Sequence, residues 1–433
     1  MRLGLEGFAT ICVLALPSCI EDRGFPCTAS DACVLDGVQG RCESAGWCSY
    51  PDTECGGLHR YEPLAGDGVG GTCIDALCGV TSVIAGADHN CAVDRLDRVW
   101  CWGANAFGQL GLGFDSQAEQ PARLATVLQG AGAAPDGYLV PESAADHACG
   151  LGGGNAVLCW GLNTGSQVTY EEAPPTVLEP LLVGNLAATA VAVSDEISCI
   201  ATGSALSCWG AALPNDQTVT LQVDDTIREL AAGDRHLCLR TASAGAYCAG
   251  EPGEGRLGGE IRNDQPLPYA QPFVAGVRLL AAGHDHSCAV VGDDASQDVL
   301  CWGSNESGQC GSSPSDPFFA APTSIATLAG GTYLGVAAGD AHTCVLREAD
   351  GHVLCWGDNL SGQVEIGDGT DGFDVKRVEL DGEPIVAVQV VAGRRHTCAR
   401  TASAIVCWGD NASLQLGTDD LAARSHVTPF DCE

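Results

Sequence analysis

The chain has 433 residues, with 55 acidic against 20 basic side chains and a formal net charge of −35. A surface of that charge repels phosphate backbones and anionic lipid headgroups, so composition argues against nucleic acid as a direct partner. Aromatic residues make up only 6%, Gly occurs 57 times and Met once, which favours short strands and turns over packed helices.

Residues 1–18 are predicted to be a secretory signal peptide. Arg2 precedes an apolar run from Phe8 to Leu16, which is too short for a transmembrane helix. The sequence "LPSC" at 16–19 resembles a bacterial lipoprotein signal, in which the cysteine, here Cys19, is acylated. Ordinary cleavage nearby is the alternative. The 25 cysteines also indicate an oxidising compartment. We therefore expect an exported protein of the cell envelope, lipid-anchored on the outer surface or in the periplasm, whose membrane contact is the lipid alone.

Residues 19–78 form a cysteine-rich spacer with few apolar side chains. A segment of that size and composition cannot fold by burial alone, so we expect it to depend on disulfides. A zinc site is disfavoured, because no C-x-x-C pair is present and His59 is the only nearby histidine. The spacer therefore predicts three bridges of open connectivity among Cys27, Cys33, Cys42, Cys48, Cys55, Cys73 and Cys78.

Seven related segments follow, each with two cysteines and most with His two residues before the first cysteine and Trp-Gly after the second. A period of roughly 50 residues predicts a propeller or a solenoid, in which each unit buries its apolar faces against its neighbours. The clearest copies are "HNCAVDRLDRVWCWGANAFGQLG", "HSCAVVGDDASQDVLCWGSNESGQCG", "HTCVLREADGHVLCWGDNLSGQ" and "HTCARTASAIVCWGDNASLQLG".

The shortest copy, "CIATGSALSC", predicts how each cysteine pair is joined. A hairpin with a two-residue turn at Gly203 and Ser204 places Cys199 directly opposite Cys208. Opposed cysteines in adjacent antiparallel strands are within reach of a disulfide. By the same reasoning the predicted disulfides are Cys91 with Cys101, Cys149 with Cys159, Cys199 with Cys208, Cys238 with Cys248, Cys288 with Cys301, Cys344 with Cys355, and Cys398 with Cys407.

Zinc binding and redox catalysis are the alternatives to a structural disulfide for each cysteine pair. The third copy has Ile197 in place of histidine and the fourth has Ala249 in place of tryptophan, yet both keep their cysteines. The pairs therefore do not depend on those neighbours, which favours a bond between the cysteines themselves. We interpret the repeated histidines as satisfying local backbone groups and the repeated tryptophans as packing between units. Cysteine parity leaves one thiol over if Cys19 is acylated, and Cys310, in place of the leucine of "GQLG", is the candidate.

These motifs, over residues 80–430, resemble repeats of the regulator of chromosome condensation family, although copies two to four depart from the "GQLG" segment. The resemblance implies an all-β fold, a seven-bladed β-propeller over residues 79–433, preceded by the small disulfide-rich segment. It also implies that the chain ends meet in one blade. A closing bridge between Cys78 and Cys432 is then expected.

No motif for a catalytic site, a cofactor or a metal stands out, so we expect no enzyme activity. The leading hypothesis is a monomeric, non-catalytic binding scaffold for a protein or glycan partner. Its candidate contacts are the long inserts at 114–140 and 312–335, with Phe318 and Phe319 as anchors; longer outer strands and crossings between blades are the alternative reading of both inserts. A secreted enzyme inhibitor acting through one propeller face is the alternative function, and guanine-nucleotide exchange by family analogy is disfavoured, because fold does not imply function.

Overall fold

The computed structural model describes five short strands within residues 34–61, and residues 80–428 apart from 94–98, 125–138, 144–145, 212–218, 252, 260–273, 314, 367–371, 403, 419–420 and 422–424. The signal peptide, Cys19, Cys78 and Cys432 lie outside these residues. The chain divides into two compact units, one of residues 1–78 with 431–433 and one of residues 79–430. Within the described ranges, no helix is long and apolar enough to span a bilayer.

The first unit contains two small antiparallel sheets. In one, β1 (Val34–Leu35) pairs with β2 (Val38–Gln39). In the other, β4 (Cys48–Pro51) lies between β3 (Arg41–Cys42) and β5 (His59–Tyr61), and its register sets Cys42 opposite Cys48. Backbone pairing therefore brings two of the spacer cysteines to opposed positions.

The second unit is built from antiparallel sheets, each made of consecutive strands; the described residues contain seven. The first three sheets are β6 (Ser82–Ala85), β7 (His89–Val93), β8 (Val99–Asn105) and β9 (Ser116–Leu124); β10 (Leu139–Ser143), β11 (His147–Leu151), β12 (Ala156–Leu162) and β13 (Thr176–Ala187); and β14 (Ala190–Val193), β15 (Ile197–Thr202), β16 (Ala205–Gly210) and β17 (Val219–Gln222).

The other four sheets repeat this order. They are β18 (Ile227–Ala232), β19 (His236–Thr241) and β20 (Ala246–Gly250); β21 (Val277–Ala282), β22 (His286–Gly292), β23 (Gln297–Ser304) and β24 (Phe318–Ser324); β25 (Tyr333–Ala338), β26 (His342–Arg347), β27 (Val353–Gly357) and β28 (Gly372–Arg377); and β31 (Gln389–Ala392), β32 (His396–Arg400), β33 (Ile405–Gly409) and β34 (Ser425–Thr428). A small hairpin, β29 (Glu379–Leu380) with β30 (Glu383–Pro384), and three 3₁₀ turns, Gly153–Asn155, Gly253–Gly255 and Ala326–Leu328, complete the described elements.

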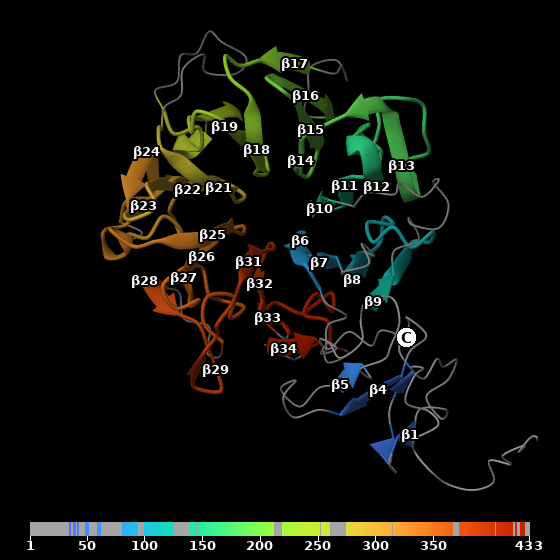
Figure 1. Ribbon diagram of the computed structural model, residues 1–433. Helices are drawn as coiled ribbons and strands as arrows, with labels where there is room; N and C mark the ends of the chain where they lie inside the picture. Colours follow the sequence, from blue (N-terminus) through green and yellow to red (C-terminus); the bar gives the residue numbers. More distant parts are fainter. Residues whose placement is uncertain are drawn as a thin grey trace, which may run out of the picture. The chain divides into compact units, whose positions relative to one another are not determined.

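The seven sheets are the blades of a β-propeller (Figure 1). The first strand of each sheet contacts the first strand of the next, and β31 contacts β6, so the described strands close a ring. Strands β7 and β27 are buried along their whole length, because a neighbouring blade covers each face of a sheet. The all-β propeller expected from the sequence is confirmed.

The strand of residues 425–428 pairs with β33 and completes the seventh blade. The expected meeting of the chain ends at Cys78 and Cys432 falls on residues outside those described. The seventh and first blades are joined by side chains. The Gln389 amide accepts a hydrogen bond from the Val83 backbone N–H at 3.0 Å and donates one to the Val83 carbonyl at 2.9 Å.

The second and third strands of every blade carry its disulfide. In the third blade the register pairs Thr202 with Ala205 and Cys199 with Cys208, as the sequence predicts, and Gly203 at the turn has φ +64°. In all seven blades the two cysteines lie opposite each other with Cα atoms 4.0 to 4.1 Å apart, and all seven predicted pairs are disulfide-bonded. Among the described cysteines, Cys310 alone is free, and it is buried in the core of the fifth blade.

We call the contact between consecutive blades a joint. At a joint, the tryptophan after the second cysteine is buried, and its indole N–H donates to a backbone carbonyl in the preceding blade. Trp356 donates to the carbonyl of Gln309 at 2.8 Å, and Trp408 to that of Gln363 at 2.9 Å. The same bond is made by Trp102, Trp160, Trp209 and Trp302, to Gln415, Gln109, Gln167 and Arg256 respectively. The predicted packing role of the tryptophans is therefore confirmed, with a directional bond added.

The repeated histidines also act across the joints, which corrects the interpretation that they serve local backbone groups. His342 Nε2 lies 2.9 Å from the Thr397 hydroxyl of the next blade. That hydroxyl donates its hydrogen to the Gln363 carbonyl, so we assign the histidine as the donor to the hydroxyl oxygen, protonated on Nε2. Equivalent contacts join His147 to Ser198, His236 to Ser287, His286 to Thr343 and His396 to Asn90.

Replacing Trp356 with Phe should separate the indole bond from the packing of the ring. We expect Trp356→Phe to lower the free energy of unfolding by about 1 kcal/mol, because the Gln309 carbonyl keeps its bond from Thr343. Trp356→Ala should cost about 3 to 5 kcal/mol. Denaturant unfolding with intact disulfides measures both. Equal losses for the two variants would show that ring packing contributes nothing.

The buried histidines should make stability depend on pH. Burial lowers the pKa of His342 to about 4, below the usual value of 6.5, so the unfolded chain binds this proton first as pH falls. The stabilising contribution is complete above pH 6.5 and is lost as pH falls toward 4, by about 1.4 kcal/mol per pH unit. His342→Gln keeps an N–H donor but does not titrate. Unfolding curves at several pH values should therefore be flatter for this variant, and parallel curves would contradict the assignment.

Candidate functional site

The turns between the first and second strands of the blades vary from repeat to repeat. Each turn carries two residues just before the histidine position, and these residues change from copy to copy. In chain order the pairs are Ala87 and Asp88, Ala145 and Asp146, Asp195 and Glu196, Asp234 and Arg235, His284 and Asp285, Asp340 and Ala341, and Arg394 and Arg395. Joints impose a constant pattern elsewhere, so this variation marks the turns as candidate functional positions.

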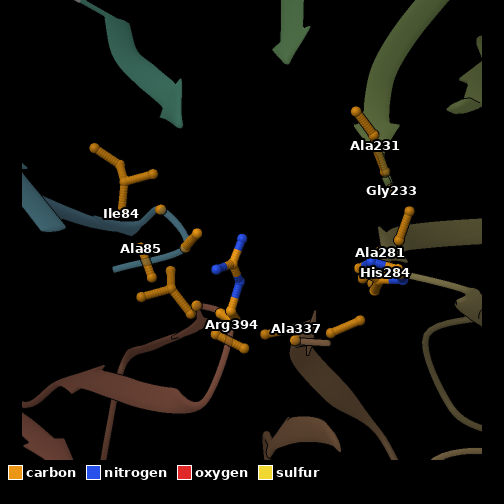
Figure 2. A pocket seen from close by; sticks show the side chains of 18 of the residues that line it. Ile84, Ala85, Ala231, Gly233, Ala281, His284, Ala337 and Arg394 are labelled. Atoms are coloured by element: carbon orange, nitrogen blue, oxygen red, sulfur yellow. The ribbon is translucent and has the colours of Figure 1, made fainter. Parts of the chain in front are cut away.

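The turns of six blades, all but the second, line a cavity of about 440 Å³ inside the ring. The first strands that lead into these turns line it too, and the lining includes Asp195, Asp234, His284, Asp340 and Arg394. Figure 2 shows the Arg394 side chain extending into the middle of this cavity, with His284 on another side of it. We call this cluster of turns the channel mouth.

Arg394 is the central cation of the channel mouth. Its guanidinium lies 3.4 Å from a carboxylate oxygen of Asp88, 3.5 Å from one of Asp340 and 3.9 Å from one of Asp195. Those carboxylates come from the first, sixth and third blades, so one side chain from the seventh blade bridges the mouth. The neighbouring carboxylates raise the pKa of Arg394, although burial opposes them, and the guanidinium stays charged.

His284 is the second cation. Its Nδ1 lies 2.7 Å from Asp285 and its Nε2 lies 3.4 Å from Asp234. The hydrogen bond with Asp285 raises the pKa of His284 to about 9, despite its burial. The same bond lowers the pKa of the Asp285 carboxyl. At neutral pH His284 is therefore an imidazolium held between two carboxylates.

The acids of the mouth exceed these two cations in number. Burial raises the pKa of Asp88, Asp146 and Asp234, and raises that of Asp340 to about 6 although Arg394 acts against it. Carboxylates that are half-buried and repel one another are stabilised by any further cation that enters among them. The mouth is therefore suited to a positively charged group.

The site shows no catalytic constellation among the described residues. No nucleophile with an adjacent base is found at the mouth, and the described chain holds no group of three or more His, Cys, Asp or Glu arranged to bind a metal. The sequence motifs for hydrolases and nucleotide enzymes are likewise missing. The mouth presents charged side chains of both signs.

The predicted anchors lie elsewhere. Phe318 and Phe319 are on β24, the outermost strand of the fifth blade, opposite Ser304 and Gly303 of β23. Phe318 is 49% exposed, whereas Phe319 packs against the core of the blade. The described parts of the two inserts form the outer strands β9 and β24, the 3₁₀ turn Ala326–Leu328 and the starts of β10 and β25. An anchoring role for Phe318 and Phe319 stays a prediction, and the channel mouth was missed, although copy-to-copy variation before the histidines could have revealed it.

Comparison with known sequences identifies the repeats. Two family models, both described as the regulator of chromosome condensation (RCC1) repeat, match residues 80–109, 277–309 and 335–363, and residues 97–131 and 297–346. The chain is 26% identical over 372 residues to the ultraviolet-B receptor UVR8 of Arabidopsis thaliana, covering 80% of each protein. It is 30% identical over 217 residues to the probable E3 ubiquitin-protein ligase HERC6 of Homo sapiens, covering 48% of this chain and 20% of that protein.

Solved structures show the same fold. Prp20p of Saccharomyces cerevisiae, whose structure is described with its binding properties to Gsp1p and histones, aligns with a TM-score of 0.64 at 19% identity over 80% of this chain and 85% of that one. Human WBSCR16 aligns with a TM-score of 0.62 at 19% identity over 75% and 87% of the two chains. At this identity the likeness supports the propeller fold alone.

Proposed function

Because the chain carries RCC1 repeats folded as a β-propeller, we propose that it is a non-catalytic scaffold whose channel mouth binds a basic segment of a partner protein. The observation behind this proposal is the contrast between joints and mouth. Disulfides and buried hydrogen bonds hold the blades in one repeated arrangement, while the mouth turns carry a different charged pair in almost every copy. Rigid frameworks with variable loops are the usual basis of recognition sites.

The charges of the mouth favour a cationic partner over an anionic one. Arg394 lies near three carboxylates and His284 near two, but burial and the charge of Asp195 still raise the pKa of the Asp146 carboxyl. An arginine or lysine side chain entering the cavity would supply the missing positive charge, and a guanidinium could bond a carboxylate through two N–H groups. The net charge of −35 would also speed the approach of a basic partner.

We place this scaffold outside the cytoplasm, in the cell envelope, with Cys19 as its lipid anchor. The support is chemical: seven buried disulfides are stable in an oxidising compartment and are not expected in a reducing one. A tethered, acidic propeller could then present its channel mouth to proteins of the same envelope.

Binding of a fluorescent peptide of alternating Arg and Gly tests the proposed site. We expect binding that weakens as salt rises, and that also weakens below about pH 6, where Asp340 becomes protonated. Asp195→Asn with Asp234→Asn should weaken it roughly fivefold to tenfold, since two carboxylates leave the mouth. Fluorescence anisotropy provides the affinity.

The matched control is Glu171→Gln with Glu172→Gln. It also removes two negative charges, but from an exposed loop that does not line the cavity. This control should leave affinity unchanged. If both double variants lost the same affinity, the net charge of the protein and not the channel mouth would explain binding. If a peptide of alternating Glu and Gly bound as tightly as the Arg peptide, recognition of cations would be refuted.

Intact mass spectrometry of the protein from its native host tests the localisation. Cleavage before Cys19 with a diacyl or triacyl mass on that residue is the expected result. Alkylation without prior reduction should modify few thiols, because the hairpin cysteines are bonded and Cys310 is buried. Many alkylated thiols on an unprocessed chain would overturn the export proposal.

A further inference from the structure

At the joint between the third and fourth blades, the three described positions that carry the bonding side chains of most other joints hold apolar residues. The position of the indole donor is Ala249, and the positions of the histidine and its hydroxyl partner are Ile197 and Leu237. All three losses fall on the same joint, because the donor and the hydroxyl belong to the fourth blade and the histidine position to the third. None of these side chains can form a hydrogen bond.

A fourth change belongs to the same set. At the fourth and sixth blades a glycine, Gly233 or Gly339, packs directly against the ring of His236 or His342, and a Cβ atom at either glycine would overlap that ring. In the third blade the ring is absent because the residue is Ile197, and the glycine position is occupied by Ser194. Ser194, Ile197 and Leu237 stand where the joint between the sixth and seventh blades has Gly339, His342 and Thr397, and we call these three replacements the coupled set.

Apolar contact takes the place of these bonds. Ile197 and Leu237 belong to one cluster with Ile227, Leu230 and Tyr247, drawn from both blades. Replacing a buried polar pair by apolar side chains need not weaken a contact. Apolar contact is non-directional, however, and does not hold the two sheets at one angle or spacing as the indole and histidine bonds do.

The cavity-lining residues of the two turns at this joint are both acids, Asp195 and Asp234. Burial raises the pKa of the Asp234 carboxyl, and the charge of Asp195 adds to that rise. At the following joint Asp234 meets the cation His284, and between the sixth and seventh blades Asp340 meets Arg394. On its cavity side the third-to-fourth joint therefore has like charges where those joints have opposite ones, although Glu196 and Arg235 attract each other beside them.

We propose that this joint is a built-in seam, at which the ring opens before it opens at any other joint. Opening would part β14 from β18 and widen the channel mouth between Asp195 and Asp234. The disulfides Cys199–Cys208 and Cys238–Cys248 lie within the two blades and not across the joint, so each sheet stays intact while the blades separate. The seam would admit a partner segment too wide for the closed cavity, but its existence does not depend on the proposed partner.

Native-state hydrogen exchange of the full chain, with disulfides intact and no partner present, tests the seam. Opening leaves the bonds within each sheet intact, so the comparison uses the amides of the first strands that point away from the second strand of the same blade. Those of β14 and β18 should exchange roughly tenfold faster than those of β25 and β31, the corresponding strands at the joint between the sixth and seventh blades. Equal exchange at the two joints, or fastest exchange between the seventh and first blades, would overturn the proposal.

Two matched variants assign the effect to the coupled set. Ser194→Gly, Ile197→His and Leu237→Thr together rebuild the histidine and hydroxyl pair, and should slow exchange at the seam while leaving the other joints unchanged. Gly339→Ser, His342→Ile and Thr397→Leu together move the apolar set to the joint between the sixth and seventh blades, where Thr397 now accepts from His342. This second variant should create a new fast joint. If the rebuilt variant folds and exchanges at the seam as fast as the wild type, the coupled set is not the cause.

Discussion

The fold depends on one constraint: both faces of every sheet must be covered by a neighbouring blade, all the way around the ring. A polar atom buried in such a face has to find its partner in the next blade. The indole N–H of Trp408 and Nε2 of His342 meet this requirement, since both bonds cross from one blade to another and end on Gln363 or on a side chain bonded to it. The residues that recur in the sequence motif are thus the ones that form the contacts between blades.

Disulfides contribute at a different level. Each closes a hairpin within one blade, between strands already paired by backbone hydrogen bonds, and none of the described disulfides crosses a joint. They restrict the unfolded chain and hold each sheet together, while the angle between sheets is left to the joints. A ring of this kind combines rigid blades with joints whose strength varies according to side-chain chemistry.

The channel mouth is formed by turn residues that the repeated contacts between blades do not use. Turn residues between the first two strands of each blade are free to vary, and folding gathers them around one cavity with Arg394 among carboxylates of three other blades. The acids exceed the cations, and burial raises the pKa of the Asp88 and Asp340 carboxyls although Arg394 acts against it. Part of the acidity of the chain is thus gathered around this cavity.

The sequence by itself determined the repeats, the all-β propeller and the pairing of Cys199 with Cys208, because a hairpin involves neighbouring residues and a two-residue turn sets its register. The free thiol of Cys310 was predicted from the odd number of cysteines left if Cys19 is acylated and from its place in the "GQLG" segment. Only the tertiary structure showed that His342 reaches Thr397, that Asp88, Asp195 and Asp340 converge on Arg394, and that Ile197, Leu237 and Ala249 share one joint. These partners are tens to hundreds of residues apart, and closure of the ring, which no local pattern encodes, brings them together.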